Sequence, residues 1–243
     1  MQYFSSLKGK KISYPSVKLF CSFDPLMTRH FTRFFLLLSL LFISLTGFSQ
    51  VVSGNFNKIY LRDNFTDNTL KWPILNNRDN FFVVQNGLFI LERRNKESEY
   101  AVFNTYSDEP KLYSLNATFR ISKQNPDGFA GVMFMTQTSG KGGFIIEINN
   151  KKQYRILQLQ GSNYKLLTGE VKDEGWLKSK YLKGNDFNNI RILVKINKAD
   201  IYLNNEYIAS TEEPTYTNGK NGIMLGPSTK IDVKQWEVRI EDK

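Results

Sequence analysis

Hydrophobic and polar residues alternate along most of the chain, and the pattern is clearest over residues 188–226. Ile190, Ile192 and Val194 occupy every second position there. Asn218-Gly219 then separates two of the apolar segments that follow. Alternation with a period of two, bounded by Asn and Gly, predicts antiparallel strands that are joined by hairpins and bury one face.

Short apolar segments of this kind recur along the rest of the chain. The dipeptide Asn86-Gly87, which lies between two of them, is the strongest short hairpin signal in the sequence. No window longer than ten residues has the 3.6-residue apolar period and the caps of a helix. The sequence therefore predicts an all-β protein, a two-sheet antiparallel β-sandwich or jelly roll. Strands are expected at 59–61, 81–84, 88–91, 100–106, 112–121, 129–134, 144–148, 154–159, 164–167, 190–196, 201–203, 207–208, 223–225 and 231–240.

The N-terminal part of the chain has a different composition. An apolar run, residues 34–45, follows Arg29 and Arg33 and precedes the small residues Gly47 and Ser49. Basic, apolar and small residues in this order are typical of a secretory signal peptide. The run is shorter than the roughly 20 apolar residues that a transmembrane helix needs.

We therefore expect residues 1–49 to be a signal peptide and residues 50–243 to form a single domain. Met27 is a candidate for the true start, because the segment from Met27 to Gln50 has the ordinary length of a signal peptide. The expected destination is the periplasm, the cell surface or the medium, with no transmembrane span in the mature protein.

Removing the signal peptide changes the composition. The formal net charge of the whole chain is +10, but the part after residue 50 keeps 27 basic and 22 acidic residues, a net charge of +5. This mild excess argues against nucleic acid as a partner. Cys21 and His30 are the only residues of their types. The mature protein would therefore contain no disulfide. It would also have no histidine to act as a base or metal ligand, and no cysteine to act as a nucleophile.

The order of several weak motifs resembles the concanavalin A-like lectin/glucanase jelly roll. The resemblance is closest to its laminin-G-like and 3-keto-disaccharide hydrolase-like branch, and it covers nearly all of the mature chain. The motifs that carry it are Asp63-Asn64-Phe65 with Trp72, Gln85-Asn86-Gly87-Leu88, Gly128 to Phe134, Gly143 to Arg155, Asn188 to Asn204, Gly219 to Gly226, and Trp236-Glu237-Val238.

This resemblance implies an exported protein that handles saccharides on a concave sheet. The Glu-x-Asp-x-x-Glu motif of the glucanase branch is missing from the sequence. Glycoside hydrolysis usually needs two carboxylates that flank the bond, and Glu147 is the one plausible inward carboxylate of the central strands. The keto-disaccharide branch implies a Glu and a Gln two residues apart, which would correspond to Ile145 and Glu147, or to Glu147 and Asn149 in a shifted register.

Candidate ligand-binding residues lie on two consecutive expected strands and in the loop after them. A polar row on the concave face could bind sugar hydroxyls, and nearby rings could pack against the sugar. The alternative is an ordinary surface pair across the hairpin, Arg155 with Glu147, worth under ~1 kcal/mol. The candidate residues are Glu147, Asn149, Tyr154, Arg155, Gln158, Tyr164 and Trp176.

Other polar and aromatic residues have structural interpretations. We expect Trp72 and Trp236 to pack in the core, because they fall at the first and last strands. Asp63, Asp67 and Asp232 are candidate ligands for a structural calcium ion, although calcium takes six to eight oxygens and solvated turn residues explain these aspartates as well. No other cofactor is expected.

Three functions are compatible with the sequence. The first is non-catalytic binding of an extracellular glycan, which the missing carboxylate pair favours. The second is a structural or adhesion role in the cell envelope. The third is a glycoside hydrolase or lyase of the 3-keto-disaccharide type, with Glu147 as its acid/base.

Overall fold

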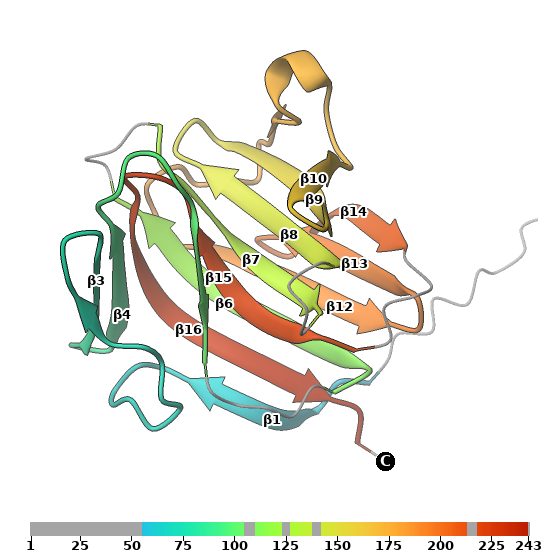
Figure 1. Ribbon diagram of the computed structural model, residues 1–243. Coiled ribbons are helices and arrows are strands. Elements are labelled where there is room, and N and C mark those ends of the chain that lie inside the picture. Colours follow the sequence, from blue (N-terminus) through green and yellow to red (C-terminus); the bar gives the residue numbers. More distant parts are fainter. Residues whose placement is uncertain (1–54, 105–109, 123–126, 138–141, 213–217, 243) are drawn as a thin grey trace, which may run out of the picture. The chain divides into compact units, whose positions relative to one another are not determined.

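The computed structural model describes residues 55–104, 110–122, 127–137, 142–212 and 218–242, which form a two-sheet antiparallel β-sandwich (Figure 1). The predicted fold class is confirmed. The only helix in these ranges is the short 3₁₀ turn η1 (Val171–Asp173). Within the same ranges, no helix has the length and apolar composition needed to cross a bilayer. The expected signal peptide lies outside the described residues.

One sheet has nine strands and contains the first and last strands of the described chain. Strand β1 (Lys58–Asp63) pairs with β16 (Lys230–Ile240), which also pairs with two of its neighbours in the sheet. The sheet order is β14 (Glu206–Glu212), β13 (Lys198–Leu203), β12 (Asn188–Lys195), β6 (Tyr113–Ile121), β16, β4 (Leu88–Arg93), β3 (Asn80–Gln85) and β2 (Leu75–Asn76).

The second sheet has seven strands and lies in front of the first in the view of Figure 1. The two-residue strand β11 (Leu177–Lys178) pairs with β9, beside the main path of the sheet. That path is β10 (Asn163–Leu166), β9 (Gln153–Gln160), β8 (Gly142–Asn149), β7 (Phe129–Thr136), β15 (Lys220–Leu225) and β5 (Tyr100–Phe103).

The expected alternation appears in the burial of the nine-stranded sheet. Along β12, buried residues alternate strictly with partly exposed ones, because one face of this strand packs on the core and the other is solvated. The turn at Asn86-Gly87 has positive φ at both residues, 54° and 70°, as a tight hairpin turn requires. Strand β8 differs, since all eight of its residues are buried.

The core between the sheets has an aromatic cluster at one end. The Trp72 ring lies 5.4 Å from those of Phe89 and Trp236, and Phe65 stacks on Phe89 at 5.6 Å. Asp63 links two residues of this cluster, because it accepts hydrogen bonds from the Trp72 Nε1 (3.0 Å) and from the Phe65 amide (2.7 Å). Both tryptophans are almost fully buried, so the prediction that they are core residues is confirmed.

Phe89 tests this core directly. It is fully buried between Phe65 and Trp72, so Phe89→Ala should leave a cavity and lower the free energy of unfolding by about 3–5 kcal/mol. Urea denaturation measures this loss. Ile196→Ala is the control, because this side chain is 77% exposed and its loss should cost less than about 0.5 kcal/mol. Equal stability of the two variants would contradict the packing described here.

Candidate functional site

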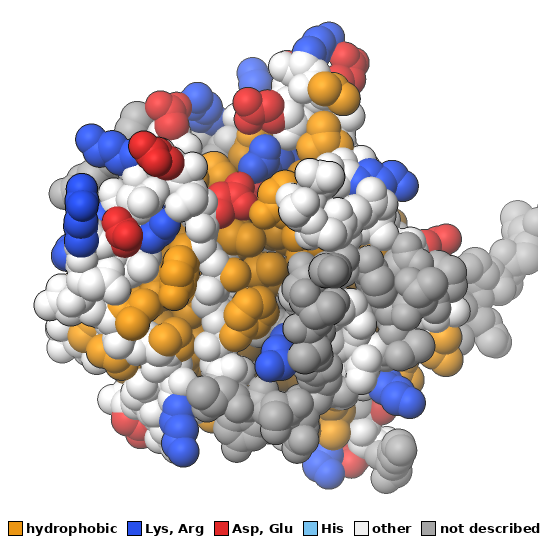
Figure 2. All heavy atoms as spheres, viewed as in Figure 1, with side chains coloured by type: hydrophobic (Ala, Val, Ile, Leu, Met, Phe, Trp, Pro, Cys, Tyr) orange, Lys and Arg blue, Asp and Glu red, His pale blue; other side chains and the backbone are white. Residues whose placement is uncertain are grey.

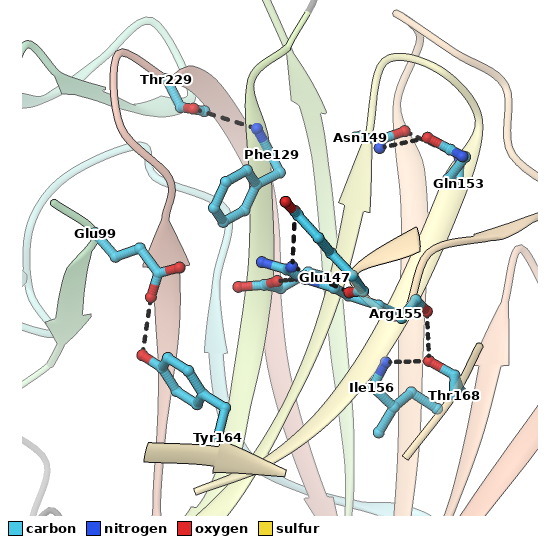
Figure 3. Close-up of polar contacts among 12 residues, drawn as sticks. Glu99, Phe129, Glu147, Asn149, Gln153, Arg155, Ile156, Tyr164, Thr168 and Thr229 are labelled. Atoms are coloured by element: carbon cyan, nitrogen blue, oxygen red, sulfur yellow. Dashed lines mark hydrogen bonds and ion pairs between the residues drawn. The ribbon is translucent and has the colours of Figure 1, made fainter. Parts of the chain in front are cut away.

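The candidate residues on β8 and β9 divide between the two faces of the seven-stranded sheet. Along β8, Phe144, Ile146 and Ile148 point into the core, so Glu147 points to the outer face. In the adjacent strand Arg155 lies directly opposite Glu147 and therefore shares that face. Figure 3 shows the two side chains meeting there.

Glu147 and Arg155 form a buried ion pair. Arg155 Nε donates to Glu147 Oε2 over 2.6 Å, and the carboxylate side chain has no exposed surface. The predicted pairing is confirmed, but its expected position as an ordinary surface contact is wrong. The second carboxylate oxygen, Oε1, is buried and has no hydrogen-bond partner among the described residues.

Aromatic rings and a loop hold Arg155 over the carboxylate. Its guanidinium carbon lies 5.0 Å from the centre of the Phe129 ring and 4.5 Å from that of Trp176. These two rings meet edge to face at 5.9 Å. Arg155 Nη1 also donates to the main-chain carbonyl of Glu174, over 3.3 Å, at the end of η1. Cation–π contacts of this kind add stabilisation where the cation is shielded from water.

Glycine in the neighbouring strand gives Glu147 its space. Gly131 of β7 pairs with Glu147 of β8. A Cβ atom at Gly131 would lie 2.3 Å from the carbonyl oxygen of Ile146 and 2.8 Å from Glu147 Cγ. A larger residue at this position would therefore displace the carboxylate or separate the two strands.

The environment of Glu147 changes its acidity. Burial raises its pKa from 4.5 to about 7, because a charged carboxylate loses its hydration there. The Arg155 charge opposes this shift, and the negative charge of Glu99 adds to it. A carboxyl group with this pKa can exchange a proton near neutral pH.

Glu99 is a site residue that the sequence reasoning missed. It lies just before β5, and its Oε2 accepts a hydrogen bond from the Tyr164 hydroxyl over 2.8 Å (Figure 3). Burial and then the Glu99 charge raise the pKa of Tyr164, so the hydroxyl remains a donor at neutral pH. No local pattern marks Glu99, since its partner is 65 residues away in the chain.

Three other predicted residues do not join this cluster. Tyr154 and Gln158 pair with Ile148 and Phe144, which point inward, so they lie on the core face of β9 and not in one row with Arg155. Asn149 lies at the end of β8, where its Oδ1 accepts from the Lys151 and Gln153 amides at 3.0 Å. Tyr154 and Gln158 therefore cannot form one polar row with Arg155, because successive residues of a strand face opposite sides. Asn149 is two residues after Glu147 and shares its face, but its side chain is bonded within the turn that follows β8.

Apolar side chains occupy the middle of the same outer face. Figure 2 shows hydrophobic side chains gathered over β7, β8 and β15, beside charged groups. They form a cluster separate from the main core, and its five members are each at most 7% exposed. We call this cluster the apolar strip; it consists of Met133, Ile145, Leu157, Leu159 and Met224.

The three aspartates considered as calcium ligands have separate partners. Asp63 accepts from Phe65 and Trp72, Asp67 accepts from the Thr69 amide over 2.9 Å, and Asp232 pairs with an arginine. In the described part of the chain, no group of three or more Asp, Glu, His or Cys residues could hold a metal ion.

The sequence of residues 44–239 matches the model of the 3-keto-alpha-glucoside-1,2-lyase-like domain family. The chain belongs to this family. The match spans most of the chain and includes Glu99, Glu147, Arg155 and Tyr164. It confirms the resemblance to the 3-keto-disaccharide hydrolase-like branch. A search of curated proteins found no match.

Solved structures with the same fold are similar in shape but distant in sequence. A carbohydrate binding module, CBM66 from Bacillus subtilis, has a TM-score of 0.52 and 11% identity over 69% of this chain and 96% of its own. A protein of unknown function with a galectin-like fold, from Bacillus subtilis, has a TM-score of 0.58 and 9% identity over 76% of this chain and 98% of its own. The catalytic domain of an endo-1,3-beta-glucanase from Thermotoga petrophila has a TM-score of 0.54 and 9% identity over 76% of this chain and 98% of its own. These likenesses confirm the jelly-roll fold.

The raised pKa of Glu147 predicts a specific dependence of stability on pH. Between pH 4.5 and about 7 the folded state holds a proton that the unfolded chain has released. The contribution of Glu147 is therefore fully present below pH 4.5 and is lost as the pH rises through about 7. Glu147→Gln removes this titration, so the stability of the wild type relative to the variant should fall across this range.

Urea denaturation of both proteins at pH 5, 6, 7 and 8 measures the difference. The glutamine variant serves as the control, because it retains the size of the side chain without an ionisable group. Parallel pH profiles, or a relative stability that rises with pH, would contradict a raised pKa at Glu147.

Proposed function

We propose that the protein binds carbohydrate, without altering it, at the outer face of the seven-stranded sheet. The observation that carries the proposal is the arrangement around Arg155, where fixed charged groups lie beside two accessible rings. Tyr164 is 44% exposed and Trp176 is half-buried. Ligand sites commonly combine aromatic walls with a few oriented polar groups, and a sugar offers both C–H faces and hydroxyls.

The ion pair gives this site its rigidity. Glu147 is closed off beneath Arg155, so its role in the proposal is to fix the guanidinium and not to contact the sugar. The groups left for hydroxyls are the edge of Arg155, the Glu99 carboxylate and the Tyr164 hydroxyl. Groups held in place before binding lose little conformational entropy when the ligand arrives, which favours affinity.

The comparisons support a carbohydrate ligand. The family is named for a glucoside lyase, and the similar folds include a carbohydrate binding module and an endo-1,3-beta-glucanase. We also propose that the protein is exported, on the signal-peptide pattern of residues 29–49, which would place its ligand among extracellular glycans.

Removal of the two rings tests the binding proposal. Trp176→Ala and Tyr164→Ala should each weaken binding of a glycan selected on an array by about tenfold or more, because an aromatic contact and its buried area are lost. Isothermal titration measures the affinity. Tyr207→Ala is the matched control, since this ring is 55% exposed on the nine-stranded sheet. Uniform weak binding across diverse glycans, or equal effects of all three variants, would overturn the proposal.

A second candidate is a lyase or hydrolase that acts on 3-keto-glucosides. The observation that favours it is the pKa of about 7 at Glu147, with the Glu99 charge close enough to influence it. A carbonyl group acidifies the neighbouring C–H bond, so a carboxylate could remove that proton while the glycosidic C–O bond breaks. A carboxyl group that titrates near neutral pH suits this general-base role.

Turnover of a 3-keto-glucoside separates the two candidates. The enzymatic account predicts product formation by the wild type and its loss in Glu147→Gln, with the folded state retained in circular dichroism. A matched control is Glu92→Gln, which changes a partly exposed carboxylate on β4 of the other sheet. Absence of turnover by the wild type would exclude the lyase and leave the binding function.

A further inference from the structure

The nine-stranded sheet has a polar groove on its own outer face, on the opposite side of the sandwich from the Arg155 site. Its volume is about 570 Å³, and it crosses three adjacent strands, β12, β6 and β16. The segment at Asn55–Asn57 forms one border, and Asn205 in the turn between β13 and β14 forms another. Most of the groove is lined by amide, hydroxyl and charged side chains.

Strand register arranges these side chains in rows. Arg191 of β12 lies opposite Asn116 of β6, and Asn116 lies opposite Glu237 of β16. Two residues along, Asn189 and Gln235 flank Thr118 in the same way. Neighbouring strands are about 4.8 Å apart, so each row presents hydrogen-bonding groups at regular intervals.

The carboxylate in the groove already has partners. Glu237 accepts hydrogen bonds from Arg62, which lies opposite it on β1, and from Arg239, two residues along β16. Burial acts to raise the pKa of Glu237, but these two arginines outweigh it and hold the pKa below its usual range. Glu237 therefore remains charged and compensated, and it needs no ligand.

Arg191 differs from those two arginines. Its guanidinium carbon lies 4.3 Å from the centre of the Tyr202 ring, and no ion pair links it to a carboxylate in the described ranges. Its Nε is buried and has no hydrogen-bond partner among the described atoms. Tyr202 supports the flat face of the guanidinium, which leaves its edge for a planar anion.

We propose that this groove is a second ligand site, which binds an acidic oligosaccharide. Arg191 would take a uronate carboxylate in a two-pronged contact, the geometry that guanidinium groups favour. The Asn116, Asn189 and Gln235 amides can each donate and accept, so they match the vicinal hydroxyls of the same chain. A neutral sugar would satisfy the amides but would leave Arg191 without a counter-charge.

Titration with an oligogalacturonate and with its methyl ester tests the proposal, because the ester keeps the hydroxyls and removes the charge. The acid should bind, binding should weaken as salt is added, and the ester should bind at least about tenfold more weakly. In ¹⁵N-labelled protein, the side-chain amide signals of Asn116, Asn189 and Gln235 should shift.

Variants locate the contact. Arg191→Gln should weaken binding of the acid by about tenfold to hundredfold. The affinity of Arg191→Lys should lie between those of this variant and the wild type, because lysine keeps the positive charge but cannot make the two-pronged contact of a guanidinium group. Lys165→Gln is the control, since it removes one exposed positive charge from the other sheet. Equal binding of acid and ester, no binding of the acid, or no effect at Arg191 would overturn the proposal.

Discussion

A single buried carboxylate places the strongest constraint on the seven-stranded sheet. Glu147 lies on β8, whose residues are all buried, and burying a charge is costly unless it is paired. Arg155 provides the pairing, and the rings of Phe129 and Trp176 enclose Arg155. Gly131 leaves room for the carboxylate from the other side. Four elements of the chain are therefore arranged around one side chain.

The rest of this outer face is largely apolar. The apolar strip occupies its middle, and charged groups lie around it. The nine-stranded sheet differs, since the groove over β12, β6 and β16 is lined mostly by polar and charged side chains. The two outer faces of one sandwich therefore present different chemistry, which is the basis for assigning them different ligands.

The sequence predicted the fold well, because period-two alternation and Asn-Gly turns are local. The alternation of β12 and the turn at Asn86 appear in the structure as expected. The short strands β2 and β11 were missed, because two residues carry no periodicity.

The site was only partly predictable. Glu147 and Arg155 were identified as a cross-strand pair, because they lie eight residues apart across one hairpin. Their burial could not be foreseen, since the enclosing rings come from β7 and from the loop after η1. Glu99 reaches Tyr164 across 65 residues of chain, and nothing in its local sequence suggests this contact.

The indole signals of the three tryptophans give the most direct test of carbohydrate binding at the Arg155 site. Trp72 and Trp236 are buried in the core, whereas Trp176 packs on Arg155 and is partly exposed. Titration of ¹⁵N-labelled protein with a glycan that binds should shift the Trp176 indole N–H in a saturable way and leave the other two unchanged. Because the Arg191 groove is assigned to acidic glycans, the deciding ligand is a neutral glycan. A neutral glycan that binds without moving the Trp176 signal would contradict the assignment of this site.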